Sequence, residues 1–243
     1  MRLSTGIAAI FALTTVSHSV FALDANEEIT PSTTPYDFLI YAVTWQPSFC
    51  KLKPETSGCD GPPARFLVHG IWPYNNSTEQ KTNRHPAFCN TAPSCEDKTE
   101  CEIEKDTLEK ISLIPEIAER VTVNPQDMFK HEWRKHGTCA GKSEAEYFAD
   151  IATLWKVVAF NGPMFNQWIG KSVLFSKFKV AFPDNTSFRC FVQNDKQYLH
   201  EVFYLIDSDG KPYLKDRNLQ IGTSCKERET FIPGEFKPVS ASG

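Results

Sequence analysis

The pattern of hydrophobic and polar positions predicts strands in the first and last thirds of the chain and helices between them. Four runs are rich in aromatic and β-branched residues, which favour buried strands. They lie at residues 36–45, 65–69, 187–192 and 200–206. We expect the second run to be ended by Gly70 and Pro73 and the last to be followed by a turn at residues 207–210. The polar and acidic residues 23–34 predict a loose start.

Helical periodicity begins near Asp106, and Pro115 is expected to interrupt it. A second helix is expected after Asn124, because Pro125 suits the first turn of a helix and Gly137 can serve as its C-terminal stop.

A third helix is expected from Ser143 to about Phe160, since Ser143 and Glu146 have the spacing of a capping box. The segment 86–101 is rich in Pro, Asn, Ser and Cys and indicates a loop pinned by disulfides. The order of strand, helices and strands favours an α+β fold over a regular βαβ alternation.

Composition and the N-terminal residues change this picture in one respect. The chain has 243 residues, of which 41% are hydrophobic and 23% charged, as in an ordinary globular protein. Arg2 precedes an apolar run at residues 6–16, and the stretch ends in Val20-Phe21-Ala22. We therefore expect a secretory signal peptide at residues 1–22 and a single domain at residues 23–243. A membrane anchor is less favoured, because the run is shorter than the ~20 residues of a spanning helix.

The net charge excludes one class of nucleic-acid-binding protein. It is −4 for the whole chain, and without Arg2 it becomes about −5, from 25 basic and 30 acidic residues. No broad basic face is implied, so a polyanionic substrate would have to be held by a few local cations in a cleft.

The eight cysteines agree with export to an oxidising compartment, where thiols pair. Four disulfides are expected, although eight cysteines allow about 105 pairings. A structural zinc site is disfavoured, because no two cysteines have the Cys-x-x-Cys spacing.

Chemically active side chains concentrate in two segments. The first is residues 66–74, where His69 stands at the end of a strand before a Gly-Ile-Trp-Pro-Tyr sequence. The second is residues 129–139, where two His, a Glu and a Lys fall within six residues. At about 100° per residue, an arc of about 140° of this helix holds His131, Lys135, Glu132 and His136. Trp133 lies about 200° from His131 and is expected to point into the core.

This cluster does not fit a metalloprotease helix. That motif needs two histidines four residues apart, about 40° on the helix, so that both reach one ion. Here His131 and His136 are five residues apart, and the chain offers no other clear ligand, so no metal is expected.

Two imidazoles, a lysine and a carboxylate suit the cleavage of RNA by its own 2′-hydroxyl group. That reaction needs a base for the 2′-OH proton, an acid for the leaving 5′-oxygen and a fixed cation for the charged phosphorane. Histidine can serve both proton-transfer roles, because its pKa lies near the working pH.

The segments His69-Gly-Ile-Trp-Pro and Lys130-His-Glu-Trp-Arg-Lys-His-Gly-Thr-Cys closely resemble the two active-site segments of the ribonuclease T(2) family. The resemblance implies a disulfide-stabilised α+β fold in which helices flank a central antiparallel sheet. It also implies a metal-independent and cofactor-free endoribonuclease that forms 2′,3′-cyclic phosphate ends and then 3′-phosphates.

The roles that this resemblance implies follow the motif positions. His69 matches the general acid and His136 the general base. His131 matches a phosphate-binding histidine, and Glu132 and Lys135 match the pair that stabilises the phosphorane.

The same resemblance makes Trp72 a candidate to stack on a base of single-stranded RNA. Tyr74 and Met128 occupy further positions that contact the base in some members, and Ile71 replaces the more usual Leu. We expect a monomer that is secreted or periplasmic and acts on single-stranded RNA, with no membrane attachment after signal removal. A secreted RNA-binding or cytotoxic protein without catalysis on the same scaffold is the alternative.

The resemblance also implies the disulfide pairing. The expected pairs are Cys89 with Cys139, Cys190 with Cys225, Cys50 with Cys59 and Cys95 with Cys101.

Overall fold

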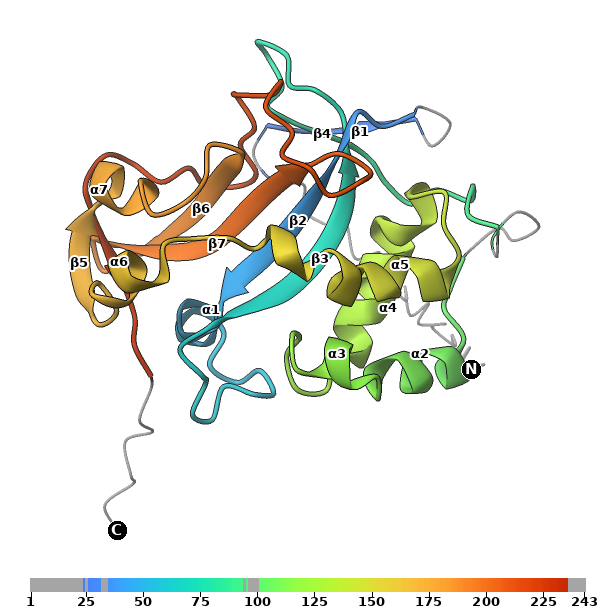
Figure 1. Ribbon diagram of the computed structural model, residues 1–243, viewed down its shortest axis with the longest axis horizontal. Helices are drawn as coiled ribbons and strands as arrows, with labels where there is room; N and C mark the ends of the chain where they lie inside the picture. Colours follow the sequence, from blue (N-terminus) through green and yellow to red (C-terminus); the bar gives the residue numbers. More distant parts are fainter. Residues whose placement is uncertain (1–23, 25, 32–34, 94, 96–100, 236–243) are drawn as a thin grey trace, which may run out of the picture.

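The computed structural model describes residues 24, 26–31, 35–93, 95 and 101–235 (Figure 1). The expected signal peptide at residues 1–22 lies outside the described residues. The strands are β1 (Glu27–Thr30), β2 (Phe38–Trp45), β3 (Phe66–Tyr74), β4 (Asn83–Pro86), β5 (Lys171–Leu174), β6 (Thr186–Gln193), β7 (Lys196–Ile206) and β8 (Glu229–Ile232). The α-helices are α1 (Gln46–Leu52), α2 (Lys105–Ser112), α3 (Pro115–Ala118), α4 (Gln126–Lys135), α5 (Glu144–Thr153), α6 (Gly162–Asn166) and α7 (Phe175–Lys179). Two 3₁₀ turns, η1 (Gly137–Cys139) and η2 (Trp155–Val157), complete the described elements.

A six-stranded sheet forms the centre of the molecule, with the order β3-β2-β7-β8-β5 and with β6 paired to β7. All its pairings are antiparallel except β7 with β8. Helices α2 to α5 gather beside β2 and β3, and α6 and α7 lie at the opposite end of the sheet (Figure 1). The architecture confirms the expected α+β class with a central, mainly antiparallel sheet.

Strand β2 explains why its sequence shows no polar alternation. Every residue of β2 is buried. Leu39, Tyr41 and Val43 point into the core beneath the helices, whereas Phe38 and Ile40 belong to a second cluster on the other face of the sheet. A strand covered on both faces needs apolar residues at successive positions, so the continuous run in the sequence marked the middle of the sheet.

Strand β3 differs from the sequence prediction, because it does not end at Gly70 but continues to Tyr74. Pro73 is tolerated because β3 is the end strand of its sheet. An edge strand can accommodate a residue that has no N–H. The longer strand places Trp72 and Tyr74 on the same face as the second core cluster.

The prediction of a loose segment at residues 23–34 was wrong in its middle part. Residues Glu27–Thr30 form β1, which pairs in parallel with β4. Its sequence, Glu-Glu-Ile-Thr, lacks the alternation by which a strand is predicted, and β1 depends on a partner strand distant in sequence.

The helix predictions were largely correct. Pro115 separates α2 from α3, and α5 begins with the capping box of Ser143 and Glu146. Helix α5 ends at Thr153, however, rather than near Phe160. The apolar side chains beyond it still pack on the core, including Trp155 and Phe160, but a 3₁₀ turn and irregular backbone bring them there.

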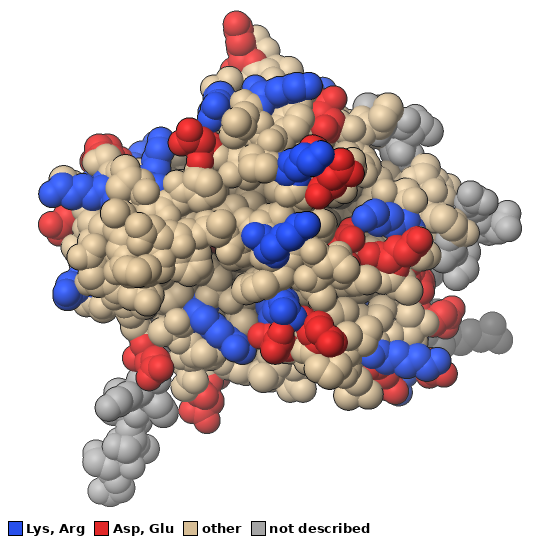
Figure 2. All heavy atoms as spheres, in the orientation of Figure 1, with Lys and Arg blue, Asp and Glu red and all other residues tan. Residues whose placement is uncertain are grey.

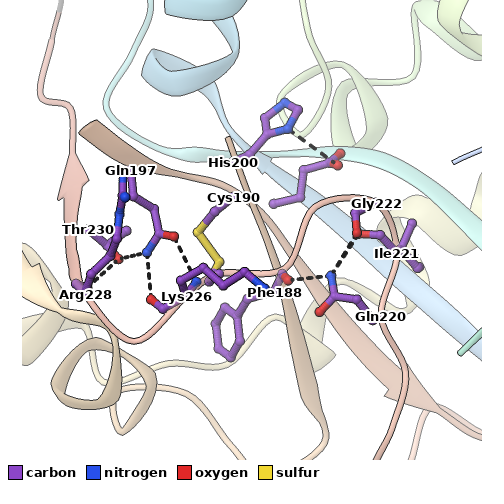
Figure 3. The surroundings of a disulfide bond; sticks show 12 residues. Phe188, Cys190, Gln197, His200, Gln220, Ile221, Gly222, Lys226, Arg228 and Thr230 are labelled. Atoms are coloured by element: carbon purple, nitrogen blue, oxygen red, sulfur yellow. Dashed lines mark hydrogen bonds and ion pairs between the residues drawn. A yellow bond between two sulfur atoms is a disulfide. The ribbon is translucent and has the colours of Figure 1, made fainter. Parts of the chain in front are cut away.

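Disulfides form in the four pairings that the resemblance implied: Cys50–Cys59, Cys89–Cys139, Cys95–Cys101 and Cys190–Cys225. Figure 3 shows Cys190, which ties β6 to the segment after residue 219. Beside it, the buried Gln197 donates to the carbonyl of Lys226 and to Thr230. These contacts hold the C-terminal segment against β6 and β7.

Charges of both signs are interspersed on the face seen in Figure 2, as the near-balanced composition predicted. Within the part of the chain that the structure describes, none of the helices is long and apolar enough to cross a bilayer.

Candidate active site

A β-bulge in the sheet presents His69. Ala42 of β2 pairs with Gly70 and Val43 pairs with Val68, so His69 is the extra residue of β3. A bulge redirects a side chain and is common beside active sites. The side chain of His69 is 35% exposed, against 1% for His85 and 12% for His200.

Helix α4 supplies the opposite wall of the site. Phe129 and Trp133 are completely buried and pack on Phe148 and Tyr147 of α5. This anchoring confirms that Trp133 points into the core. Glu132 is also buried, on the side of α4 that faces β3, and His69 Nε2 lies 3.5 Å from Glu132 Oε1.

The end of α4 brings His136 to the same place. His136 is the C-cap residue directly after α4, and Gly137 packs closely on Trp133 where the chain turns into η1. A Cβ on Gly137 would stand 2.4 Å from a ring carbon of Trp133. His136 is 4% exposed, and its Nδ1 has no hydrogen-bonding partner among the residues that the structure describes.

Trp72 connects these groups. Its Nε1 donates a hydrogen bond of 2.5 Å to Glu132 Oε2. Its ring stacks on His136 with centroids 5.0 Å apart and meets His69 edge-on at 5.2 Å. Both histidines therefore contact the same indole ring, and a single hydrogen bond ties that ring to the carboxylate that faces His69.

The two histidines have opposite electrostatic surroundings. Burial alone would lower the pKa of His69, but the carboxylates of Glu201 and Glu132 raise it to about 9. Burial, together with the neighbouring His85 and Lys135, holds the pKa of His136 well below its usual value. At neutral pH, His69 is therefore a cation and His136 a neutral imidazole. Groups whose surroundings separate their pKa values in this way are suited to acid and base roles.

Lys135 is engaged by the N-terminal segment. Its Nζ lies 3.4 Å from Glu27 Oε1, and the same carboxylate contacts His85 Nε2. Burial would raise the pKa of Glu27, but the hydrogen bond with His85 and the charge of Lys135 lower it to about 2. The ring of His85 lies 5.4 Å from that of His136, so a carboxylate of β1 lies at the side of the candidate site.

The remaining predicted residues lie around this group. His131 is exposed on α4, where it lines a hollow with Lys130, Arg134 and Phe88. Although His131 reaches solvent, neighbouring protein atoms partly desolvate its imidazole, and this desolvation and the charge of Lys135 lower its pKa. Met128 is partly buried against the core.

Tyr74 is 2% exposed, and its hydroxyl group donates to Asn83 Oδ1. Its ring stacks on that of His85. Trp72 is 5% exposed. Base binding by Trp72, Tyr74 and Met128 stays a prediction.

Sequence reasoning missed Glu27, His85, Arg189 and Glu201. These residues lie in segments without a recognisable motif, and they reach the site only through pairing of distant strands. The isolated Glu201, buried in an apolar strand, was the one signal that could have drawn attention, because a buried carboxylate requires a partner. Among the described residues, no group of three or more His, Cys, Asp and Glu side chains is arranged to hold a metal ion.

The sequence model of the Ribonuclease T2 family matches residues 36–225, which is most of the chain and includes both motif segments. The chain belongs to the ribonuclease T2 family. Ribonuclease 1 of Arabidopsis thaliana is 21% identical over 88% of this chain and 92% of its own length. A probable ribonuclease of Haemophilus influenzae is 25% identical over 61% of this chain, but the match spans only 52% of that protein.

Solved structures of the family share the fold. Human RNase T2 has a TM-score of 0.54 at 20% identity, covering 82% of this chain and 99% of its own. A mutant of RNase MC1 in complex with 5′-UMP has a TM-score of 0.57 at 18% identity, covering 82% of this chain and 99% of its own. Family membership and relatives named ribonuclease support an endoribonuclease.

Proposed function

We propose that the protein is a metal-independent endoribonuclease that cleaves single-stranded RNA through a 2′,3′-cyclic phosphate to 3′-phosphate ends. The observation that carries this proposal is the pair of histidines in contact with the ring of Trp72, one held as a cation and the other as a neutral base. RNase NT and RNase MC1, which share the fold, have been crystallised with 5′-AMP and 5′-UMP. A nucleotide ligand of this fold supports an RNA substrate for this chain.

In the first step, the neutral His136 takes the proton of the 2′-hydroxyl group. The 2′-oxygen forms a bond to phosphorus, and the bond from phosphorus to the 5′-oxygen breaks. His69 donates its Nε2 proton to that leaving oxygen, which departs as a 5′-hydroxyl group. The direction of proton transfer follows from the charge that each histidine carries before the reaction.

The phosphorane gains negative charge in this step and needs fixed donors and cations. Lys135 supplies the charge, and His131 at the rim binds an adjoining phosphate. Glu132 fixes the indole of Trp72 and faces His69, so it keeps both groups in place. Because Lys135 already contacts Glu27, the substrate phosphate has to compete with that carboxylate.

In the second step the roles reverse, as microscopic reversibility requires. His69, now neutral, accepts a proton from water, whose oxygen attacks phosphorus. The bond to the 2′-oxygen breaks, and His136 returns its proton to that oxygen, leaving a 3′-phosphate.

We further propose that residues 23–243 act as one secreted or periplasmic domain, as a monomer, after removal of residues 1–22. The four disulfides fit an oxidising compartment.

Kinetics of His69→Phe and His136→Phe test the assignment. Each is expected to lower kcat by at least ~10²-fold if the two residues are the acid and the base. An RNA with a single 2′-deoxy nucleotide at the cleavage position is the matched control substrate and should resist the wild-type enzyme. RNA binding by the wild type without turnover would favour the non-catalytic alternative, and unchanged turnover in both variants would refute the assignment.

A further inference from the structure

Glu201 is a buried carboxylate that none of the roles above uses. It lies in β7, is 1% exposed, and its Oε1 is 2.6 Å from His69 Nδ1. The two residues are 132 positions apart in the sequence. Desolvating a carboxylate costs several kcal/mol unless partners offset it, so its place behind the proposed general acid calls for a functional reason.

Two bulges bring this pair together. His69 is the extra residue where β3 pairs with β2. In the same way, Arg189 of β6 pairs with Glu201 and Cys190 pairs with Leu199, which leaves His200 as the extra residue of β7. Glu201 stands opposite Thr44 of β2. Without the bulges, side chains along β3 and β7 would alternate strictly between the two faces of the sheet. The faces on which His69 and Glu201 lie, relative to their strand neighbours, would then change.

The carboxylate is held from three strands. Thr44 Oγ1 of β2 donates to Oε1 over 3.1 Å, and Arg189 Nη1 of β6 donates to Oε2 over 3.3 Å. His200 Nδ1 of β7 lies 3.9 Å from Oε2 (Figure 3). Arg189 is fixed in turn by Asp24 at 2.9 Å. These partners fix the position of the Glu201 carboxylate. The imidazole of His69 must therefore adopt the orientation in which it can hydrogen-bond to that carboxylate.

We propose that Glu201 is a positioning residue for the reaction: by accepting the Nδ1–H of His69, it orients the imidazole so that Nε2 carries the transferable proton toward the leaving 5′-oxygen. This inference rests on the proposed function. Nε2 is the nitrogen that faces Glu132 across the site. A carboxylate that fixes the tautomer and orientation of a histidine is a known arrangement in enzymes that transfer protons through imidazole.

The charge of Glu201 acts with its geometry. The titratable groups that face His69 are Glu201 on β7 and Glu132 on α4, and Arg189 opposes their effect. Burial would raise the pKa of Glu201, but His200 and His69 lower it, so Glu201 remains ionised beside His69. Removing this charge should therefore make His69 lose its proton at a lower pH.

The test is the pH dependence of kcat/KM for Glu201→Gln, which keeps the size and a hydrogen-bond acceptor but removes the charge. The alkaline limb, expected near pH 9 in the wild type, should move down by roughly 1–3 pH units. The value of kcat at its optimum should fall by about 10-fold or more. Glu201→Asp, which restores the charge but shortens the side chain, should return the limb toward alkaline pH while kcat stays reduced.

Asp216→Asn is the matched control, because Asp216 is also buried and accepts hydrogen bonds, from the backbone of Ser77 and Asn218, away from the site. It should lower stability to urea without moving the alkaline limb. If Glu201→Gln behaves like this control, Glu201 is only structural and the proposal is wrong.

An NMR titration of His69 gives a readout that needs neither turnover nor a folded variant. In the wild type, a His69 pKa near 9 supports the proposal, and a value at or below the ordinary one overturns it even if Glu201→Gln does not fold. A wild type that forms no cyclic phosphate although His69 titrates near this pH would instead contradict the proposed function.

Discussion

Gly70 is the position at which the smallest change should do the most harm to the site. It lies in β3 between His69 and Trp72, and Glu132 packs directly over it. A Cβ at this position would stand 1.9 Å from Glu132 Oε2 and 2.4 Å from Trp72 Nε1. Ordinary contact begins at 3.4 Å, so Gly70→Ala would push the Glu132 carboxylate away by about 1.5 Å or displace the indole, and would break the hydrogen bond between them.

The expected loss of activity follows from this displacement. A misplacement of about 1 Å in a catalytic group can cost about 10²-fold in rate, so kcat/KM of Gly70→Ala should fall by about 10²-fold or more. Loss of a hydrogen bond to a charged group costs about 1.5–3 kcal/mol. Stiffening of the unfolded chain by Ala returns about 0.4–1 kcal/mol. Relieving the overlap by moving packed side chains costs about 1–3 kcal/mol more. The net loss of stability should therefore be about 1.5–5.5 kcal/mol.

The assay is kcat/KM on a short fluorogenic RNA, with urea unfolding under non-reducing conditions. Gly162→Ala is the matched control, because a Cβ there meets no atom within 4 Å, and it should keep wild-type activity. Activity of Gly70→Ala within about threefold of the wild type, in a folded protein, would show that the contact of Trp72 with Glu132 is not needed for catalysis.

Three further predictions concern Lys135, pH and the disulfides. Glu27→Gln should lower KM for RNA several-fold, on the order of 1 kcal/mol, because it frees Lys135 to bind phosphate. Glu28→Gln is the control and should leave KM unchanged, because Glu28 is exposed and pairs with Arg84. A raised KM in Glu27→Gln would mean that Glu27 supports Lys135 instead. The profile of kcat/KM against pH should stay flat through neutrality. It should fall on the alkaline side as His69 loses its proton near pH 9, and on the acid side only well below the usual histidine pKa, where His136 gains a proton. A fall of kcat/KM to half its maximum already at neutral pH would contradict these charge states. Replacing Cys89 and Cys139 by Ala should lower the free energy of unfolding by about 4 kcal/mol, and replacing Cys50 and Cys59 by about 2.5 kcal/mol. The first disulfide closes the longer loop, because the sequence separations are 50 and 9. Equal losses in urea unfolding would exclude a difference in loop entropy.

The local part of the site could be predicted from the sequence, because it depends on spacing within one helix and one strand. Helical geometry placed Trp133 in the core and put Glu132 and His136 on a shared arc, and both lie beside Trp72 in the structure. The pairing of the cysteines came from the family resemblance, since the cysteine spacing alone left every pairing open.

The parts that depend on strand register could not be predicted. The bulge at His69 and the position of Glu201 opposite Thr44 arise from how β2, β3 and β7 align, and a hydrophobic pattern contains no information on register between distant strands. Glu27 was missed for a related reason, because a short polar strand acquires its role only when it pairs with β4. The burial of His136 also was not evident, since an angle on a helix does not show which elements cover it.

The most direct test of the central claim is to incubate the oxidised, mature protein with single-stranded RNA and excess chelator at about pH 5 and about pH 7, and to identify the new ends by mass spectrometry. The account predicts 2′,3′-cyclic phosphate ends paired with 5′-hydroxyl ends, followed by slower conversion of the cyclic ends to 3′-phosphates. RNA that stays intact with chelator and is cut only when a metal ion is restored would contradict the two-histidine mechanism.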